Sequence, residues 1–143
     1  MSAVTVTELI VGLGLGFLLA AAVFIVLRRR WIGGGRPLML CAYRTPADLR
    51  WRLGLMRISD DRLDWFSVAG PSPRPERTWG RHELDLGAPV PSREPIPGLP
   101  DAITVSGRSA SGPVELALVS SAYTAVRAWL ESAPPGTGVS NVA

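Results

Sequence analysis

The sequence contains no lysine, one cysteine and one histidine. All 15 of its basic side chains are arginine, against 12 acids in 143 residues, which we interpret as the mark of a GC-rich genome. The single Cys41 excludes an intrachain disulfide, so nothing indicates an oxidising compartment. The single His82 excludes a metal cluster or a catalytic triad that needs two histidines, and its position beside Glu83 is typical of a surface residue.

The net charge of +3 is unevenly distributed along the chain. Arg28–Arg30 supply three positive charges by themselves, whereas residues 36–143 hold twelve arginines against eleven acids. A protein that binds nucleic acid needs a basic face or stripe. The near-neutral balance of this larger part therefore predicts no nucleic-acid partner.

A charge-free run of nineteen residues, Leu9–Leu27, lies near the N-terminus. As a helix it would span roughly 28 Å, close to the roughly 30 Å thickness of the hydrocarbon core. A secretory signal has basic residues before a shorter apolar core, but here residues 1–8 carry no basic side chain and the arginines follow the run. We therefore expect a retained transmembrane helix over 9–27; a cleaved signal or a reversed anchor is the alternative.

The arginines after the run also predict its direction. Moving an arginine to the bilayer centre costs about 2.5–3.5 kcal/mol, and basic flanks stay in the cytoplasm. Arg28, Arg29 and Arg30 therefore predict a cell-membrane protein with residues 1–8 outside and the C-terminal domain in the cytoplasm. Trp31 suits the headgroup boundary, and Gly33–Gly35 completes a juxtamembrane segment and joint over 28–36.

Three small residues, Gly12, Gly16 and Ala20, are spaced by four within the apolar run. This spacing places them on one helix face, where small side chains let two membrane helices approach closely. The pattern predicts a helix–helix contact and a weak homodimer. A plain anchor is the alternative, because glycine is common in membrane helices.

From Pro37 onward the sequence changes to short alternating runs separated by turn residues. Such a period of two predicts one-sided antiparallel strands. We expect strands in Leu38–Arg44, Trp51–Ile58, Leu63–Val68, Thr78–Trp79, His82–Leu86, Ile103–Val105 and Val114–Leu118. The alternation changes phase at Gly54, which predicts a bulge, and Ser59–Asp61 predicts a hairpin turn. The proline-rich segment 87–100 cannot form a central strand.

The last element changes period. Ala122, Val126, Trp129 and Leu130 share one face of a predicted helix, which Ser120 or Ser121 would cap. We therefore predict a mainly-β domain over 37–131, a small antiparallel barrel or sandwich of six to seven strands with a C-terminal amphipathic helix. This order of elements resembles that of pleckstrin-homology-like barrels. Residues 132–143 are predicted to be a disordered tail.

Three segments carry a closer resemblance: "WRLGLMRISDDRLDWFSV" (51–68), "SPRPERTW" (72–79) and "AYTAVRAWLESAPPG" (122–136). They resemble a small actinobacterial family of single-pass membrane proteins of unknown function, often encoded beside the ATP synthase genes. The resemblance covers the anchor and most of residues 37–136. Because that family has no established activity, the resemblance implies no catalytic residue.

The residue types that enzymes use are scarce here. Cys41 lies in an apolar strand, which is typical of a core residue, and no phosphate loop, CxxC pair or nucleophile elbow is present. We therefore predict that the protein is not an enzyme and has no cofactor or metal.

A binding surface is what remains. Arg44, Arg50, Arg52 and Arg57 lie on or between the first two predicted strands, and if Trp51 and Leu53 point inward, Arg50 and Arg52 point outward together. These four arginines are the candidate contacts for lipid head groups; pairing with Asp48 and Asp61 is the structural alternative. The sequence thus predicts a membrane-tethered interaction module that binds a membrane-protein partner or head groups at the cytoplasmic leaflet. The alternative function is an exported lipid- or wall-facing protein.

Overall fold

The computed structural model describes residues 2–132, which form two units that meet between Gly35 and Arg36. The first unit is one long helix, α1 (Ala3–Gly33). It is long and apolar enough to cross a membrane, and it contains the whole predicted span of residues 9–27. The helix continues through Arg28–Arg30 and Trp31, so the basic segment is helical.

The predicted glycine joint is partly a helix end. Gly33 is the last helical residue, and Gly34 follows in the left-handed region with a φ of 53°. The Gly34 N–H donates to the carbonyl oxygen of Arg30 at 3.1 Å, which satisfies one of the last carbonyls of the helix. Glycine adopts this conformation without steric cost, and for this reason it commonly ends helices.

The second unit is built on an antiparallel sheet. Its strands are β1 (Leu38–Arg44), β2 (Arg52–Ile58), β3 (Arg62–Ser67), β4 (Arg77–Gly80), β5 (Asp85–Pro91), β6 (Ile103–Ser109) and β7 (Gly112–Leu118). Within residues 36–132 these seven strands form one sheet in the order β4-β3-β2-β1-β7-β6-β5. The helix α2 (Ser120–Glu131) follows. The predicted order of elements, seven strands and then one helix, is confirmed.

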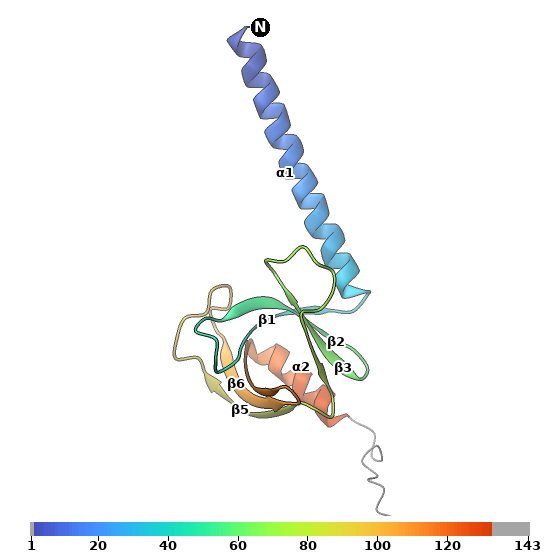
Figure 1. The fold of residues 1–143 in the computed structure, drawn as a ribbon, viewed down its shortest axis with the longest axis vertical. Helices are drawn as coiled ribbons and strands as arrows, with labels where there is room; N and C mark the ends of the chain where they lie inside the picture. The colour runs from blue at the N-terminus through green and yellow to red at the C-terminus, as the bar shows by residue number, and fades with distance from the viewer. Residues whose placement is uncertain (1, 133–143) are drawn as a thin grey trace, which may run out of the picture. The chain divides into compact units, whose positions relative to one another are not determined.

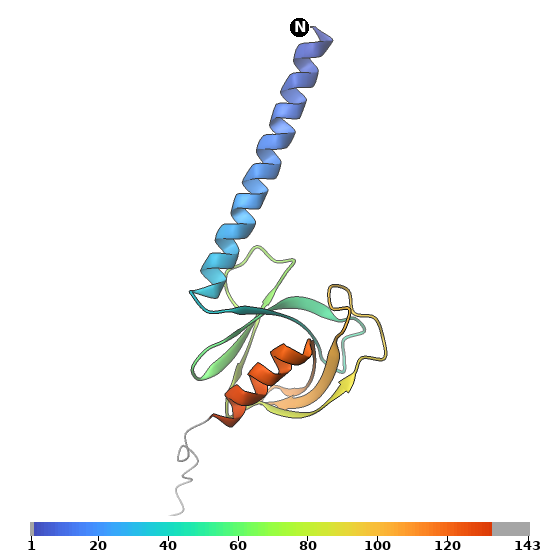
Figure 2. The ribbon, with the colours of Figure 1, turned by 180° about the vertical axis from the view of Figure 1, so that it is seen from behind.

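The inner face of the bent sheet and one face of α2 enclose the main core (Figures 1 and 2). Trp65 of β3 is fully buried there with Met56 and Leu116. Ala122, Val126 and Trp129 of α2 belong to the same cluster, as their spacing predicts. The predicted serine cap is wrong: Val119 is the N-cap residue, and no side chain caps the helix.

A second, smaller core lies on the outer face of the sheet. The segment 92–102, which we call the strap, connects β5 to β6 and places Ile96, Leu99 and Ala102 against Ala42 and Ala117. Trp51 and Leu53 pack against the same cluster. The expectation that Trp51 and Leu53 point into the main core is therefore wrong, because the strap supplies apolar cover on the opposite face.

The phase change at Gly54 has a different cause from the predicted bulge. The pairing of β1 with β2 is regular from Leu38↔Arg57 to Tyr43↔Arg52. A Cβ atom on Gly54 would overlap the ring of Trp65 and the carbonyl oxygen of Phe66. Glycine at position 54 therefore makes room for the indole in the core, and the strand needs no bulge there.

The prolines of 87–100 lie where a sheet tolerates them. β5 is an edge strand, and its pairing with β6 shifts register between Leu86 and Pro89. Proline cannot donate to a ladder and is restricted to edges and bulges. Arg127 of α2 donates to the carbonyl oxygen of Leu86 at 3.1 Å, so a helix side chain covers part of this edge.

Candidate functional site

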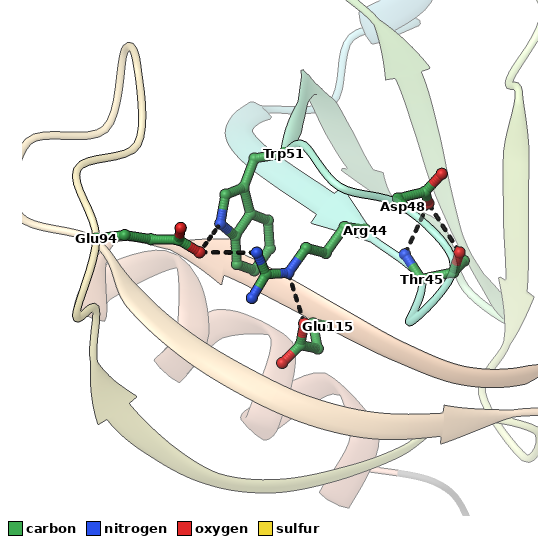
Figure 3. Close-up of polar contacts among 6 residues, drawn as sticks. All are labelled: Arg44, Thr45, Asp48, Trp51, Glu94 and Glu115. Atoms are coloured by element: carbon green, nitrogen blue, oxygen red, sulfur yellow. Dashed lines mark hydrogen bonds and ion pairs between the residues drawn. The ribbon is translucent and has the colours of Figure 1, made fainter.

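The four candidate arginines do not share one face. Arg44 lies at the end of β1 on the outer face, clamped between two carboxylates (Figure 3). Its Nε donates to Glu115 at 2.6 Å and its Nη1 donates to Glu94 at 2.7 Å. The guanidinium lies 4.3 Å from the centroid of the Trp51 ring. These carboxylates raise the Arg44 pKa above its usual value. Arg44 holds the sheet and the strap together.

Arg57 also has a partner within the domain. It donates to Asp64 at 2.8 Å, and Asp64 is only 1% exposed. Asp64 further accepts a hydrogen bond from Thr78 at 3.0 Å. A buried carboxylate needs such partners because burial penalises its charge. Arg57 on β2 therefore makes a structural ion pair with Asp64 on β3. The partner is not the expected Asp48 or Asp61.

Arg52 lies on the inner face, at the end of the sheet where β1 ends and β2 begins. Its Nη1 donates to the hydroxyl oxygen of Tyr43 at 2.9 Å, and its Nη2 donates to Glu76 at 2.7 Å. The predicted outward surface shared by Arg50 and Arg52 is therefore wrong. Arg50 precedes β2 in an exposed loop, whereas Arg52 lies on the inner face of β2, at the solvent-exposed end of the sheet.

A second arginine reaches the same hydroxyl group. The Nε of Arg77, at the start of β4, donates to the Tyr43 oxygen at 3.1 Å, which raises the Arg77 pKa. Among the described residues, Arg77 has no carboxylate within ion-pair distance, and its two terminal amino groups make no hydrogen bond. Arg77 therefore has four N–H donors available to bind another group.

Beside Arg77 the sheet encloses a small cavity of about 110 Å³, which we call the opening. Its lining residues come from β1, β4, β6 and β7 and the connections between them: Tyr43, Thr45, Arg77, Trp79, Ser109, Ser111, Pro113 and Val114. Sites for drug-sized ligands usually occupy about 300–1,000 Å³. The opening therefore suits one small polar group better than a whole organic molecule.

The chemistry of the opening favours an anion. Arg77 offers a guanidinium fork, and forks of this kind hold phosphate and carboxylate oxygens by paired N–H···O bonds. The Tyr43 oxygen already accepts from two guanidinium groups, so its own proton is available to donate. The hydroxyl groups of Ser109 and Ser111 lie 3.0 Å apart at the same rim.

The loop between β1 and β2 is held in one conformation beside the opening. Asp48 accepts from the N–H and from the hydroxyl group of Thr45, both at 2.8 Å (Figure 3). These two hydrogen bonds are the main cause of the lowered Asp48 pKa, and Arg52 and Arg77 contribute at longer range. The carboxylate thus fixes the turn that carries Leu49 and Arg50.

Sequence reasoning missed most of this site. Only Arg52 of the four candidate arginines contributes to it, while Tyr43, Arg77 and the two serines were not selected. A partial signal existed, since Tyr43, Arg52, Arg77 and Ser109 all lie at strand ends. However, which strand ends meet depends on the sheet order, and the sequence predicted the strands without their pairing.

Elsewhere the described residues hold no alternative centre. Within residues 2–132, no group of three or more His, Cys, Asp or Glu could hold a metal ion. Cys41 is buried, and burial raises its thiol pKa to about 12, so the thiolate is not formed at neutral pH. Its role as a core residue is confirmed. Of the predicted tail over 132–143, Ser132 is the C-cap residue of α2, and 133–143 lie outside the described residues.

Comparison with known proteins gives a family match. The family model described as "Protein of unknown function (DUF2550)" matches residues 15–136. This confirms the expectation of a family of unknown function; the actinobacterial source and the gene neighbourhood stay predictions. No curated protein matches the sequence.

Solved structures show likeness of fold alone. The crystal structure of the C-terminal domain of an unknown protein from Leishmania infantum is 13% identical, with 71% of this chain and 94% of that chain covered and a TM-score of 0.47. The Slm1-PH domain in complex with phosphoserine is 13% identical, with 66% and 88% covered and a TM-score of 0.44. Another Slm1-PH structure is 14% identical, with 66% and 90% covered and a TM-score of 0.45.

Proposed function

The chain belongs to the family of unknown function DUF2550, and from its geometry we propose a membrane-tethered, non-enzymatic module that binds the phosphate of a head group. In this proposal α1 is the anchor and the opening is the binding site. Arg77 holds the phosphate oxygens, and Tyr43, whose hydroxyl oxygen accepts from Arg52, donates its hydroxyl proton to one of them. The single observation that carries the proposal is Arg77, a cation beside a small polar cavity with no ion pair to a described residue.

The position of the domain follows from the flanking charges. Arg28–Arg30 keep the end of α1 on the cytoplasmic side, which brings residues 36–132 to the cytoplasmic leaflet. A tether raises the effective concentration of a weak site near its ligand. One arginine that holds a single phosphate is therefore sufficient for binding at the membrane. Self-association through Gly12, Gly16 and Ala20 stays a prediction. A membrane-protein partner is the alternative to a lipid head group as the ligand of the domain.

The test uses the full chain in maltoside micelles, which carry no phosphate. Glycerol phosphate and inorganic phosphate are titrated while NMR follows the backbone amides and the arginine Nε–H signals. We expect saturable shifts at Arg77, Arg52 and Ser111. Arg77→Gln should weaken binding by about tenfold or more, because a hydrogen bond to a charged group contributes about 1.5–3 kcal/mol.

Arg93→Gln is the matched control. It removes the same charge from a different cavity, the outer groove of about 350 Å³ that Arg93 lines with Arg44 and Glu115. Binding should be unchanged in this variant. If Arg93→Gln weakens binding as much as Arg77→Gln does, or if no signal around the opening moves, the proposed site is wrong.

A further inference from the structure

Leu49 is the most exposed large apolar side chain of the sheet domain. It is 97% exposed, whereas Val68, Val90 and Val119 are between 37% and 51% exposed. A single exposed leucine needs no explanation by itself. Leu49, however, directly follows the turn of residues 45–48 that Asp48 closes through Thr45, so the start of the exposed bend that carries it is fixed.

The end of the sheet that carries Leu49 combines apolar and basic side chains. Pro46 and Ala47 are exposed in the same loop. The loop between β3 and β4 begins beside β2, because the Val68 N–H donates to the Leu53 carbonyl oxygen at 3.3 Å; Val68 and Ala69 are exposed there as well. The β1–β2 loop lines the opening through Thr45, and the β3–β4 loop leads into Arg77 in its wall.

Each loop also carries one arginine. Arg50 follows Leu49, and Arg74 lies in the β3–β4 loop; both are exposed, and neither guanidinium makes an ion pair or hydrogen bond with a described residue. The acids nearby are already engaged, since Asp48 binds Thr45 and Glu76 binds Arg52. An apolar tip beside arginines of this kind is complementary to an anionic bilayer, whose surface is negative and whose interior is apolar.

From this placement we propose that the β1–β2 loop docks on an anionic lipid bilayer by inserting Leu49, with Arg50 and Arg74 at the level of the phosphates. The inference rests on the proposed function, because it assumes that the domain works at the membrane. Four residues separate the end of α1 at Gly33 from the start of β1 at Leu38. Fully extended they reach about 14 Å, so the domain stays close to the bilayer that holds its anchor.

The test places an environment-sensitive NBD fluorophore on the full chain through Leu49→Cys. The only native thiol, Cys41, is buried and protonated at neutral pH, so the unmodified chain should incorporate no label. The labelled chain is reconstituted in nanodiscs of phosphatidylcholine alone or of phosphatidylcholine and phosphatidylglycerol in equal parts. Ala125→Cys, on the exposed face of α2, is the control position.

We expect a blue shift of the label at position 49 in the anionic nanodiscs, and quenching of it by spin-labelled lipid. Both effects should be smaller in neutral nanodiscs and absent at position 125. The double change Arg50→Ser and Arg74→Ser should reduce the quenching at position 49; both residues are exposed, so circular dichroism should show an unchanged fold.

Two results would overturn the proposal. The label at position 49 could be as water-exposed as the label at 125 in both lipids, which would leave the loop as a surface for a protein partner. Alternatively, the quenching could be unaffected by lipid charge and by the double serine change, which would refute docking on an anionic surface. The phosphate titration in micelles involves no bilayer, so it can succeed or fail independently of this result.

Discussion

At the scale of single residues, Gly54 shows how one missing side chain organises the core. The Trp65 ring occupies the space above Gly54, and the indole Nε1 donates to the Cys41 carbonyl oxygen at 3.1 Å. The sheet therefore accommodates its largest buried side chain only because position 54 carries no Cβ atom. This packing, rather than a bulge, produces the change of alternation in β2.

The change Gly54→Ala should destabilise the domain. The new methyl group overlaps the ring of Trp65 and a backbone oxygen of Phe66, and overpacking of this kind costs about 1–3 kcal/mol. Urea unfolding of the full chain in micelles, followed by tryptophan fluorescence, measures the loss. Gly70→Ala is the control, because its Cβ would have its nearest neighbour at 3.5 Å; a stability change of equal size in both variants would contradict this account.

At the scale of elements, one carboxylate adds polar contacts to the apolar packing that holds the strap. Glu94 accepts from the Trp51 Nε1–H at 2.8 Å and from Arg44 at 2.7 Å. The hydrogen bond from Trp51 is the main cause that lowers the Glu94 pKa, and the charge of Arg44 adds to it. A lowered pKa means that the folded state favours the charged form, so this stabilisation is complete above the usual carboxyl range and is lost as pH falls through the lowered value.

Acidification should therefore release the strap before the main core unfolds. Hydrogen exchange with mass spectrometry should show protection of 92–102 falling below about pH 4, the usual range of a glutamate pKa. Glu94→Gln should reduce this protection at neutral pH and flatten its pH dependence. Asp101→Asn, which changes an exposed acid of the same segment, should behave like the original chain. A pH dependence that persists in Glu94→Gln would assign the effect to another group.

At the scale of the whole molecule, the sequence predicted the elements better than the faces they present. Alternation locates a strand whichever side is buried, so β1, β2, β3, β6 and β7 could be found from their patterns. It could not assign the inner face of β2, because Trp51 and Leu53 are covered by the strap, and a proline-rich segment gave no sign of contributing to a core. The opening was missed for the related reason that it needs the order of strands that are distant in sequence.

The orientation of the whole chain is the premise of both proposals, and the flanking charges predict it. Each of Arg28–Arg30 opposes transfer by about 2.5–3.5 kcal/mol at the bilayer centre, and acidic residues such as Glu8 contribute little to orientation. Alkaline phosphatase fused after Ala143 should therefore be inactive, since it needs export, and a fluorescent protein at the same place should be bright. Replacing Arg28–Arg30 with glutamine while changing Ser2, Thr5 and Thr7 to arginine should exchange the two signals. Strong phosphatase activity from the unmodified chain would place the opening outside the cytoplasm and favour the exported alternative.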